Sequence, residues 1–230
     1  MHFFRNHQRL NLSAYPGLEV HACEFSKDNY SGSLFEEHNI SKPDFIAKYV
    51  QSRKSEFIAG RYCAQMALSH LGIQGVEVKK LTDQSPQWPA GLAGSISHCG
   101  NYAISAVADK KKYAFIGIDC ETIISCATRQ EIRNIVINID ELELITEKIA
   151  DLNLATTLAL SIKESFFKAI FPATKLHVDF NDIDIVDISS DQNYFQINCT
   201  QRITDIINRQ TFRVHYFQVN ATTICTLLAA

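Results

Sequence analysis

The sequence predicts an α+β fold made of two mixed halves. In the first half a strand-like segment at 18–25 precedes a long helical pattern at 44–71, and strand-like runs return at 102–108. In the second half, helical segments are followed by segments with an apolar period of two, which is the period of a strand. The order of elements lacks the regular strand–helix alternation of a doubly wound parallel sheet. We therefore expect two sub-domains, residues 1–112 and 113–230.

Local signals set the bounds of the expected elements. The segment Ser41-Lys42-Pro43 is typical of a helix start, because a hydroxyl caps free N–H groups and proline fits the first turn. The polar residues 109–112 predict the turn of a hairpin. Asp140 is a suitable N-cap, and Pro172, which lacks an N–H group, is expected to end a helix. Gly60 inside a helix costs about 1 kcal/mol relative to alanine, which indicates close packing against it. The other expected elements are strands at 76–81, 113–118, 178–188, 194–199, 211–219 and 222–228, helices at 128–139, 140–150 and 152–171, and a loop at 82–94.

Composition and charge exclude several classes of function. The 230 residues carry a net charge of -3, which argues against a broad nucleic-acid surface. We expect no membrane span, because no apolar run is long enough for a bilayer. The polar start lacks the apolar core of a signal peptide, so we expect a cytoplasmic protein. The seven cysteines include no CxxC pair, which argues against a thiolate zinc site.

Two carboxylates stand two residues apart at the end of an apolar run. In a strand, Asp119 and Glu121 would point to the same side. Like charges this close raise each other's pKa unless a cation lies between them, and Mg²⁺ prefers oxygen ligands. The pair is therefore a candidate metal site. Two solvated acids at an exposed strand end explain the same pattern, and surface acids are the rule.

A third carboxylate, Glu164, lies on an expected helix some forty residues later. Ser161, Glu164, Ser165 and Lys168 are spaced to share one face, with Lys163 beside them. Three carboxylates and two lysines could hold a magnesium ion and a pyrophosphate. An amphipathic surface helix with one glutamate–lysine pair explains the same spacing.

Two further segments carry residues suited to phosphate. In the segment 94–101 the glycines permit close approach of the backbone to a phosphate. The side chains of Ser97, His98 and their polar neighbours can donate hydrogen bonds to phosphate oxygens. Arg53 and Arg61 fall on one side of a helix, and the fork of arginine suits phosphate. A serine-rich turn and a basic helix face in water are the alternatives.

Taken together and in this order, these segments resemble a 4'-phosphopantetheinyl transferase of the surfactin-synthetase-activating type, most closely its enterobactin synthetase component D-like subgroup. The resemblance extends from about Arg53 to Phe180. It implies two similar α+β sub-domains with pseudo-two-fold symmetry and an active site in the cleft between them. The motifs that carry it are RKxEFxAGRxxA from Arg53, PxWPxGxxGSISHCG from Pro86, GIDxE from Gly117 and KESxxKA from Lys163.

The resemblance implies a role for each candidate residue. Glu164 is the candidate base, and Lys168 would neutralise or protonate the leaving phosphate. Gln84 stands where relatives often have an arginine, which leaves one basic contact to coenzyme A open. The implied metal ligands are Asp119, Glu121 and Glu164; the implied pyrophosphate contacts are Lys163 and Lys168; the implied coenzyme A contacts are Ser97, His98, Arg53 and Arg61.

The implied reaction is Mg²⁺-dependent transfer of the 4'-phosphopantetheine arm of coenzyme A to a serine of an apo carrier protein, with release of 3',5'-ADP. The expected client is a siderophore synthetase or a related peptide or polyketide synthetase, and the expected state is a monomer. Two alternatives stay open. One is an inactive relative that only binds coenzyme A or a carrier protein. The other is a phosphodiesterase that removes the arm.

Overall fold

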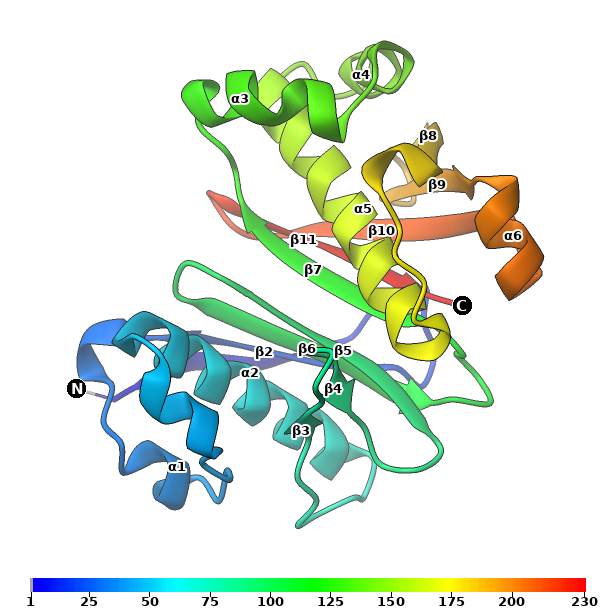
Figure 1. Cartoon of the computed structure of the whole chain (residues 1–230). Coiled ribbons are helices and arrows are strands. Elements are labelled where there is room, and N and C mark those ends of the chain that lie inside the picture. Colours follow the sequence, from blue (N-terminus) through cyan, green and yellow to red (C-terminus); the bar gives the residue numbers. More distant parts are fainter. Residues whose placement is uncertain (1) are drawn as a thin grey trace. The chain divides into compact units, whose positions relative to one another are not determined.

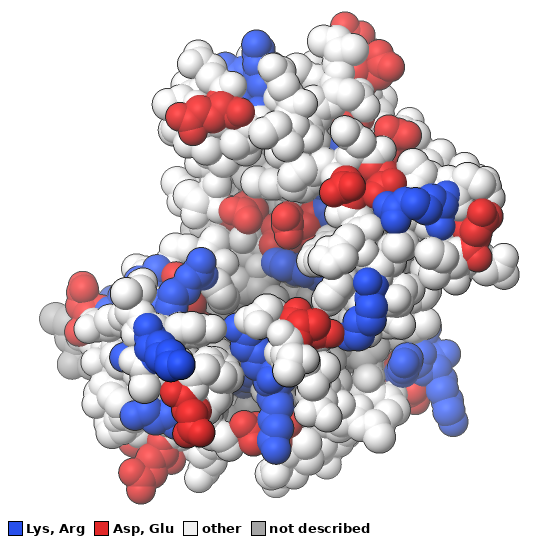
Figure 2. Space-filling view, in the orientation of Figure 1, with Lys and Arg blue, Asp and Glu red and all other residues white. Residues whose placement is uncertain are grey.

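The computed structural model describes residues 2–230 and confirms the predicted α+β class. The chain divides into Met1–Ala114, here unit 1, and Phe115–Ala230, here unit 2, each with its own sheet and helices (Figure 1). Acidic and basic side chains are interspersed on the face seen in Figure 2, as expected for a small net charge. Within residues 2–230, no helix combines the length and apolar character needed to cross a bilayer.

Unit 1 is built on a four-stranded antiparallel sheet with one long helix packed on it. Across the sheet the strands are β1 (Phe4–Leu10), β2 (Glu19–Phe25), β6 (Tyr102–Asp109) and β5 (Leu92–Cys99). The long helix is α2 (Gln51–His70), and the small elements are α1 (Leu34–Glu37), β3 (Lys79–Lys80) and β4 (Pro86–Gln87).

Helix α2 lies close to the sheet because of a glycine. A Cβ added to Gly60 would stand 2.8 Å from Cγ2 of Ile96 on β5, so a larger residue would push the helix away. This confirms the close packing predicted for Gly60. Around it, the buried residues of α2 form the core with β2 and β6; they include Ile58, Ala59, Cys63, Ala64, Ala67 and Leu68.

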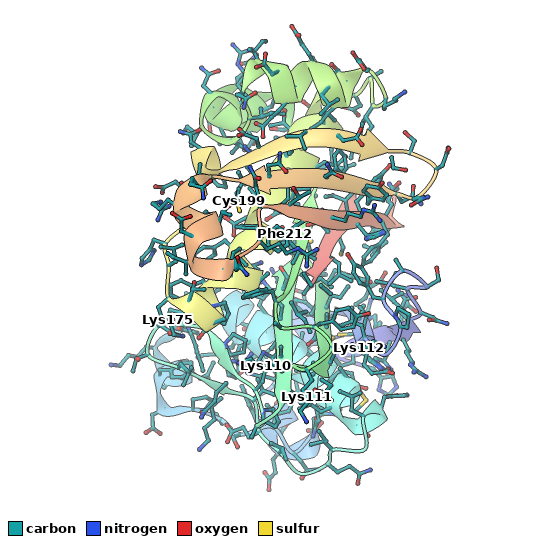
Figure 3. The ribbon with its side chains drawn as sticks, turned by 90° about the vertical axis from the view of Figure 1, so that its right-hand side faces the viewer. Lys110, Lys111, Lys112, Lys175, Cys199 and Phe212 are labelled. Carbon is teal, nitrogen blue, oxygen red and sulfur yellow. The ribbon has the colours of Figure 1, made fainter. Side chains whose placement is uncertain are left out.

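Two interpretations of the sequence in unit 1 are wrong. The segment 94–101 is not the serine-rich turn given as an alternative, because most of it belongs to β5, which pairs with β6 from Leu92 to Cys99. The residues 109–112 are not the turn of a hairpin. Both edges of β6 are already paired, with β2 and β5, so the next strand joins the sheet of unit 2 instead. Lys110, Lys111 and Lys112 project from this connection (Figure 3).

Unit 2 is built on a five-stranded antiparallel sheet, with one long helix packed across two of its strands. Across the sheet the strands are β7 (Ile116–Thr122), β11 (Thr223–Ala229), β10 (Thr211–Asn220), β9 (Tyr194–Cys199) and β8 (Ile183–Ser189). The helices are α3 (Cys126–Val136), α4 (Ile139–Thr146), α5 (Leu152–Thr174) and α6 (Gln201–Ile207), and α5 is the one that packs on β7 and β11.

Two expected helix boundaries in unit 2 are corrected. The N-cap of α4 is Asn138 and not Asp140, because Asn138 and Glu141 form a reciprocal capping box. Pro172 does not end α5, which continues to Thr174. Proline in the last turn removes only one N–H group, and the helix closes with the N–H of Lys175 bonded to the Phe171 carbonyl at 2.8 Å.

Three histidines meet at the edge of unit 1. Nε2 of His7 lies 3.2 Å from Nδ1 of His21, and the ring of His70 lies 4.5 Å from that of His21. His21 is fully buried, and burial, with the neighbouring His70 and His7, lowers its pKa to about 4. Burial and His70 also lower the pKa of His7. The fold therefore favours the neutral forms of His21 and His7 where an unfolded chain would protonate them.

This cluster predicts that acid destabilises the protein. A lowered pKa in the folded state means that stability is full above pH 6.5, the unfolded value, and falls as the pH drops from 6.5 towards 4. At pH 5 the loss from His21 is on the order of 2 kcal/mol. Urea denaturation at pH 7.5 and pH 5 measures it. His21→Gln should lose less stability over this range than the wild type, whereas the exposed control His2→Gln should behave as wild type. Equal losses in His21→Gln and wild type would contradict the prediction.

Candidate active site

Strand β7 and helix α5 are in direct backbone contact at Gly117. A Cβ added there would stand 1.8 Å from the Ser165 carbonyl oxygen and 2.6 Å from the Ala169 nitrogen. These distances leave no room for any side chain, so only glycine permits the packing. Because alternate residues of a strand share a face, Asp119 and Glu121 point to the same side as Gly117, towards α5.

Helix α5 holds Asp119 at two points. Asp119 is 2% exposed. Its Oδ2 accepts a hydrogen bond from the Ser161 hydroxyl at 2.8 Å, and its Oδ1 accepts one from the Lys168 ammonium at 2.5 Å. The helix face predicted from spacing is thus the one that contacts β7 at Ser161 and Lys168. Ser165, predicted on the same face, instead donates to the Ile162 carbonyl of its own helix.

Three carboxylates and one ammonium interact in this cluster. Burial raises the pKa of Glu121 to about 7, and Asp119 and Glu164 contribute to the rise against Lys168. Burial also raises the pKa of Glu164, with Lys168 opposing and Asp119 contributing. Burial alone would lower the pKa of Lys168, but Asp119 and the two glutamates raise it. When ionised, the cluster has more negative than positive charge, which favours a further cation.

The donor chemistry of this cluster fits magnesium. Mg²⁺ prefers oxygen ligands and usually takes only one or two protein carboxylates. Among residues 2–230, no three His, Cys, Asp or Glu side chains form a group that could hold a metal ion. Asp119, Glu121 and Glu164 are thus ligands of the right chemical type that do not converge on one point in this structure, and Lys168 engages one oxygen of Asp119.

Lys163 lies in the interior of unit 2. Its side chain is 3% exposed, and its ammonium bridges both carboxylate oxygens of Glu141 at 2.9 Å. Glu141 also accepts hydrogen bonds from the N–H groups of Asn138 and Ile185. The pair joins α5, the start of α4 and β8. Lys163 is thus bound to Glu141, whereas Lys168 is bound to Asp119.

A pocket of about 280 Å³ borders Glu164 within unit 2. Its lining mixes apolar and aromatic side chains with Lys163, Glu164 and Asp179. A cavity of this kind accepts a slender ligand that has both apolar and polar groups. The other lining residues of the pocket are Phe167, His177, Val178, Phe180 and Ile183.

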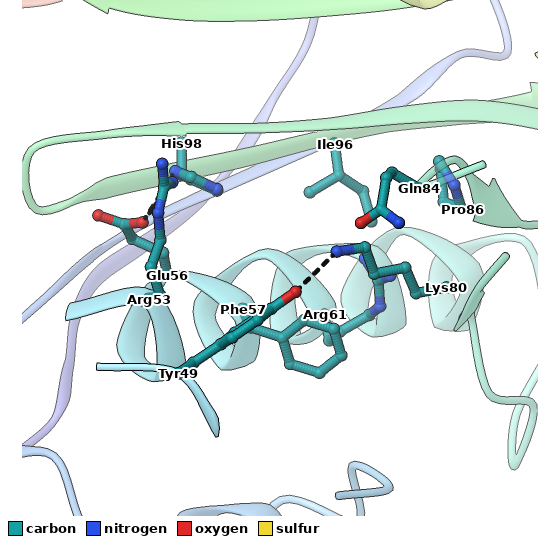
Figure 4. A pocket seen from close by; sticks show the side chains of 10 residues that line it. All are labelled: Tyr49, Arg53, Glu56, Phe57, Arg61, Lys80, Gln84, Pro86, Ile96 and His98. Atoms are coloured by element: carbon teal, nitrogen blue, oxygen red, sulfur yellow. Dashed lines mark hydrogen bonds and ion pairs between the residues drawn. The ribbon is translucent and has the colours of Figure 1, made fainter. Parts of the chain in front are cut away.

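Unit 1 contains a basic pocket of about 490 Å³ (Figure 4). Arg53, Arg61 and Lys80 line it together with His98, and Glu56 is the acid among its lining residues. Such an excess of cationic donors suits phosphate oxygens. The pocket therefore brings together three of the four residues predicted to bind coenzyme A.

Glu56 organises one side of the basic pocket. It accepts hydrogen bonds from Arg53 and Lys27, each at 2.9 Å. Burial alone would raise the pKa of Glu56, but the Lys27 hydrogen bond and the charges of His98, Lys27 and Arg53 hold it below its ordinary value. The carboxylate stays ionised and fixes the arginine at the mouth of the pocket.

Arg61 carries a donor suited to an anion. Its guanidinium lies 4.7 Å from the centroid of the Phe57 ring, and burial lowers its pKa to about 10 against the opposing charge of Glu77. Its Nε is buried and has no hydrogen-bond partner among residues 2–230. A buried N–H group without a partner costs about 1–3 kcal/mol, which an anionic ligand would recover.

Ser97 and His98 lie on opposite faces of β5. His98 lines the basic pocket with Ile96. Successive strand residues point to opposite sides, so the Ser97 side chain, which is 5% exposed, lies on the other face of the sheet. The structure thus separates two residues that stand together in the motif.

Sequence reasoning missed several pocket residues. Lys80 donates to the hydroxyl of Tyr49 at 3.0 Å, and both line the basic pocket. Lys80 sits in a two-residue strand, where nothing in the local pattern distinguishes it from other surface lysines. Gln84, which the sequence analysis named, lines the same pocket.

Comparison with known proteins identifies the family. A model of the 4'-phosphopantetheinyl transferase N-terminal domain matches residues 41–108, and a model of the 4'-phosphopantetheinyl transferase superfamily matches residues 115–222. The chain is 32% identical to enterobactin synthase component D of Escherichia coli K12 over 217 residues, covering 93% of this chain and 94% of the relative. The chain belongs to the 4'-phosphopantetheinyl transferase superfamily.

The chain is also similar to other proteins with names of this kind. The chain is 30% identical to enterobactin synthase component D of Salmonella typhimurium over 220 residues, which cover 94% of this chain and 88% of the relative. It is 33% identical to a 4'-phosphopantetheinyl transferase of Mycobacterium tuberculosis over 147 residues, 61% of each chain. The family and reaction class that the motifs predicted are confirmed.

The buried Lys163–Glu141 pair predicts a double-mutant pattern. Lys163→Met should lower the free energy of unfolding by about 3–5 kcal/mol, because it leaves the Glu141 carboxylate buried without its cation. Glu141→Gln should be similarly damaging, and the double variant should recover much of the loss. Urea denaturation measures all three. The control Glu143→Gln, exposed on the same helix, should change stability by less than about 0.5 kcal/mol. A Lys163→Met variant as stable as this control would contradict the prediction.

Proposed function

We propose that this transferase moves the 4'-phosphopantetheine arm of coenzyme A to a serine hydroxyl of an apo carrier-protein domain and releases 3',5'-ADP. The observation that carries the proposal is the set of three acids around Lys168 where α5 packs on β7. Such a set combines the ligands for Mg²⁺ with a cation for a pyrophosphate.

The acids of unit 2 would serve the reacting phosphates. Asp119, Glu121 and Glu164 would hold Mg²⁺, which when bound stabilises negative charge on the pyrophosphate. Glu164, whose raised pKa brings it towards neutrality, would take the proton of the carrier serine directly or through water. Lys168 would neutralise or protonate the leaving phosphate.

The basic pocket of unit 1 would bind the nucleotide end of coenzyme A. Arg53, Lys80 and His98 would contact its phosphates, and the unpartnered Nε–H of Arg61 would donate to the same group. Ser97, on the other face of β5, would contact a different part of coenzyme A.

The pocket beside Glu164 would receive the pantetheine arm, which carries both apolar and polar groups. In coenzyme A the arm is attached to the pyrophosphate. The start of the arm must therefore lie near the residues that hold the pyrophosphate. The Lys163 ammonium has three N–H donors, and two of them bond to the two carboxylate oxygens of Glu141. The remaining donor would contact the coenzyme at this pocket, which is lined by Lys163 and Glu164 together.

The client we propose is the carrier domain of a siderophore synthetase. This rests on the relatives named enterobactin synthase component D, at about 30% identity over most of the chain.

The test is the mass of apo carrier proteins after incubation with the enzyme, coenzyme A and Mg²⁺. A panel of siderophore, peptide, polyketide and fatty-acid carrier proteins should show one added phosphopantetheinyl group, fastest for the siderophore carrier. Asp119→Ala and Glu164→Gln should slow transfer at least 10²-fold, the range that one catalytic acid or base supplies.

The exposed acid Glu131 provides the control, and Glu131→Gln should transfer at the wild-type rate. Undiminished transfer by Glu164→Gln would remove Glu164 from the mechanism. No transfer to any carrier by the wild type would contradict the proposed function. Loss of the arm from a holo carrier would instead indicate a phosphodiesterase.

A further inference from the structure

Thr226 on β11 places a buried hydroxyl against helix α5. Thr226 of β11 stands directly opposite Asp119 of β7 in the antiparallel register, so both side chains share one face of the sheet. Its neighbours on this face, Ile224 and Leu228, belong to the apolar core. Thr226 is fully buried, in a row that is otherwise apolar. Its hydroxyl therefore needs partners inside the protein.

Those partners belong to one residue of α5. Oγ1 of Thr226 donates to the Ser161 carbonyl at 2.8 Å and lies 2.9 Å from the Ser161 hydroxyl oxygen. The Ser161 hydroxyl donates to Oδ2 of Asp119 at 2.8 Å. An ionised carboxylate only accepts, so the one hydrogen of the Ser161 hydroxyl goes to Asp119. The one hydrogen of the Thr226 hydroxyl is then shared between the carbonyl and hydroxyl oxygens of Ser161, which both lie within hydrogen-bond distance.

The Ser161 hydroxyl points in a different direction from several other hydroxyls of α5. A serine in a helix commonly turns its hydroxyl to the carbonyl four residues before it, and Thr156, Thr157 and Thr174 of α5 all do so. Ser161 does not follow them, since its hydroxyl is directed towards the sheet. With Thr226 beside it, the rotamer that faces Asp119 gains a second hydrogen-bond partner.

We propose that Thr226 is a positioning residue that acts through Ser161 to orient the Asp119 carboxylate for Mg²⁺ binding. The proposal rests on the role of Asp119 in the proposed function. The Ser161 bond fixes one oxygen of Asp119, and Lys168 engages the other. The shared hydrogen of Thr226 contacts both oxygens of Ser161 and so holds the rotamer that donates to Asp119. Hydrogen bonds in a chain polarise one another, so this contact also strengthens the bond that Ser161 makes to the carboxylate.

The test uses the isosteric change Thr226→Val, with Thr223→Val as a matched control on the same strand. Thr223 is also buried, at 6% exposed, and its side chain makes no contact with Ser161. Thr226→Val should weaken Mn²⁺ binding, measured by electron paramagnetic resonance with coenzyme A present, by about 3- to 10-fold, the effect of one ordinary hydrogen bond. It should lower kcat by a similar factor and leave KM for coenzyme A unchanged.

Two further variants keep the test decisive. Thr226→Ser, which retains the hydroxyl, should restore Mn²⁺ binding. Ser161→Ala should weaken it, and adding Thr226→Val to Ser161→Ala should cause no further loss, because Thr226 acts through Ser161. Wild-type Mn²⁺ affinity in Thr226→Val, or fully additive losses in the double variant, would overturn the proposal. Because Mn²⁺ binding needs no carrier protein, this result is independent of failure to find a client.

Discussion

The close approach of α5 to β7 at Gly117 is the constraint on which the candidate site depends. A side chain at Gly117 would overlap the backbone of α5 at Ser165 and Ala169, so the separation of helix and strand is set by a missing Cβ. Two residues further along β7, the same face presents Asp119 to Ser161 and Lys168. A larger separation would break both contacts, because a hydrogen bond is lost within a fraction of an ångström.

This packing brings buried acids together, and their mutual repulsion favours the binding of a cation. Burial and mutual repulsion raise the pKa of Glu121 to about 7 and also raise that of Glu164, while Lys168 compensates only one charge. Groups buried for structural reasons alone are usually paired, as Glu141 is with Lys163. The unpaired negative charge beside Asp119 therefore marks a place for a cation, and the paired charge at Glu141 marks a structural contact.

The sequence predicted the residues whose position follows from local periodicity. Asp119 and Glu121 on one strand face, and Ser161 and Lys168 on one helix face, follow from periods of 2 and 3.6. The prediction failed where distant segments decide. The serine-rich segment 94–101 is compatible with a turn until its pairing with β6 is known, and as part of a strand it places Ser97 and His98 on opposite faces. Thr226 reads as one more β-branched strand residue, because its role depends on a register that only the folded sheet defines.

Gly117→Ala tests the dependence of the site on this packing most directly, with Mn²⁺ binding in the presence of coenzyme A and the rate of carrier-protein modification as readouts. Gly32→Ala is the control, since a Cβ there has its nearest neighbour at 3.8 Å. The account predicts that Gly117→Ala is less stable and loses both Mn²⁺ binding and transfer, whereas Gly32→Ala retains both. A folded Gly117→Ala variant with wild-type Mn²⁺ affinity and transfer rate would contradict it.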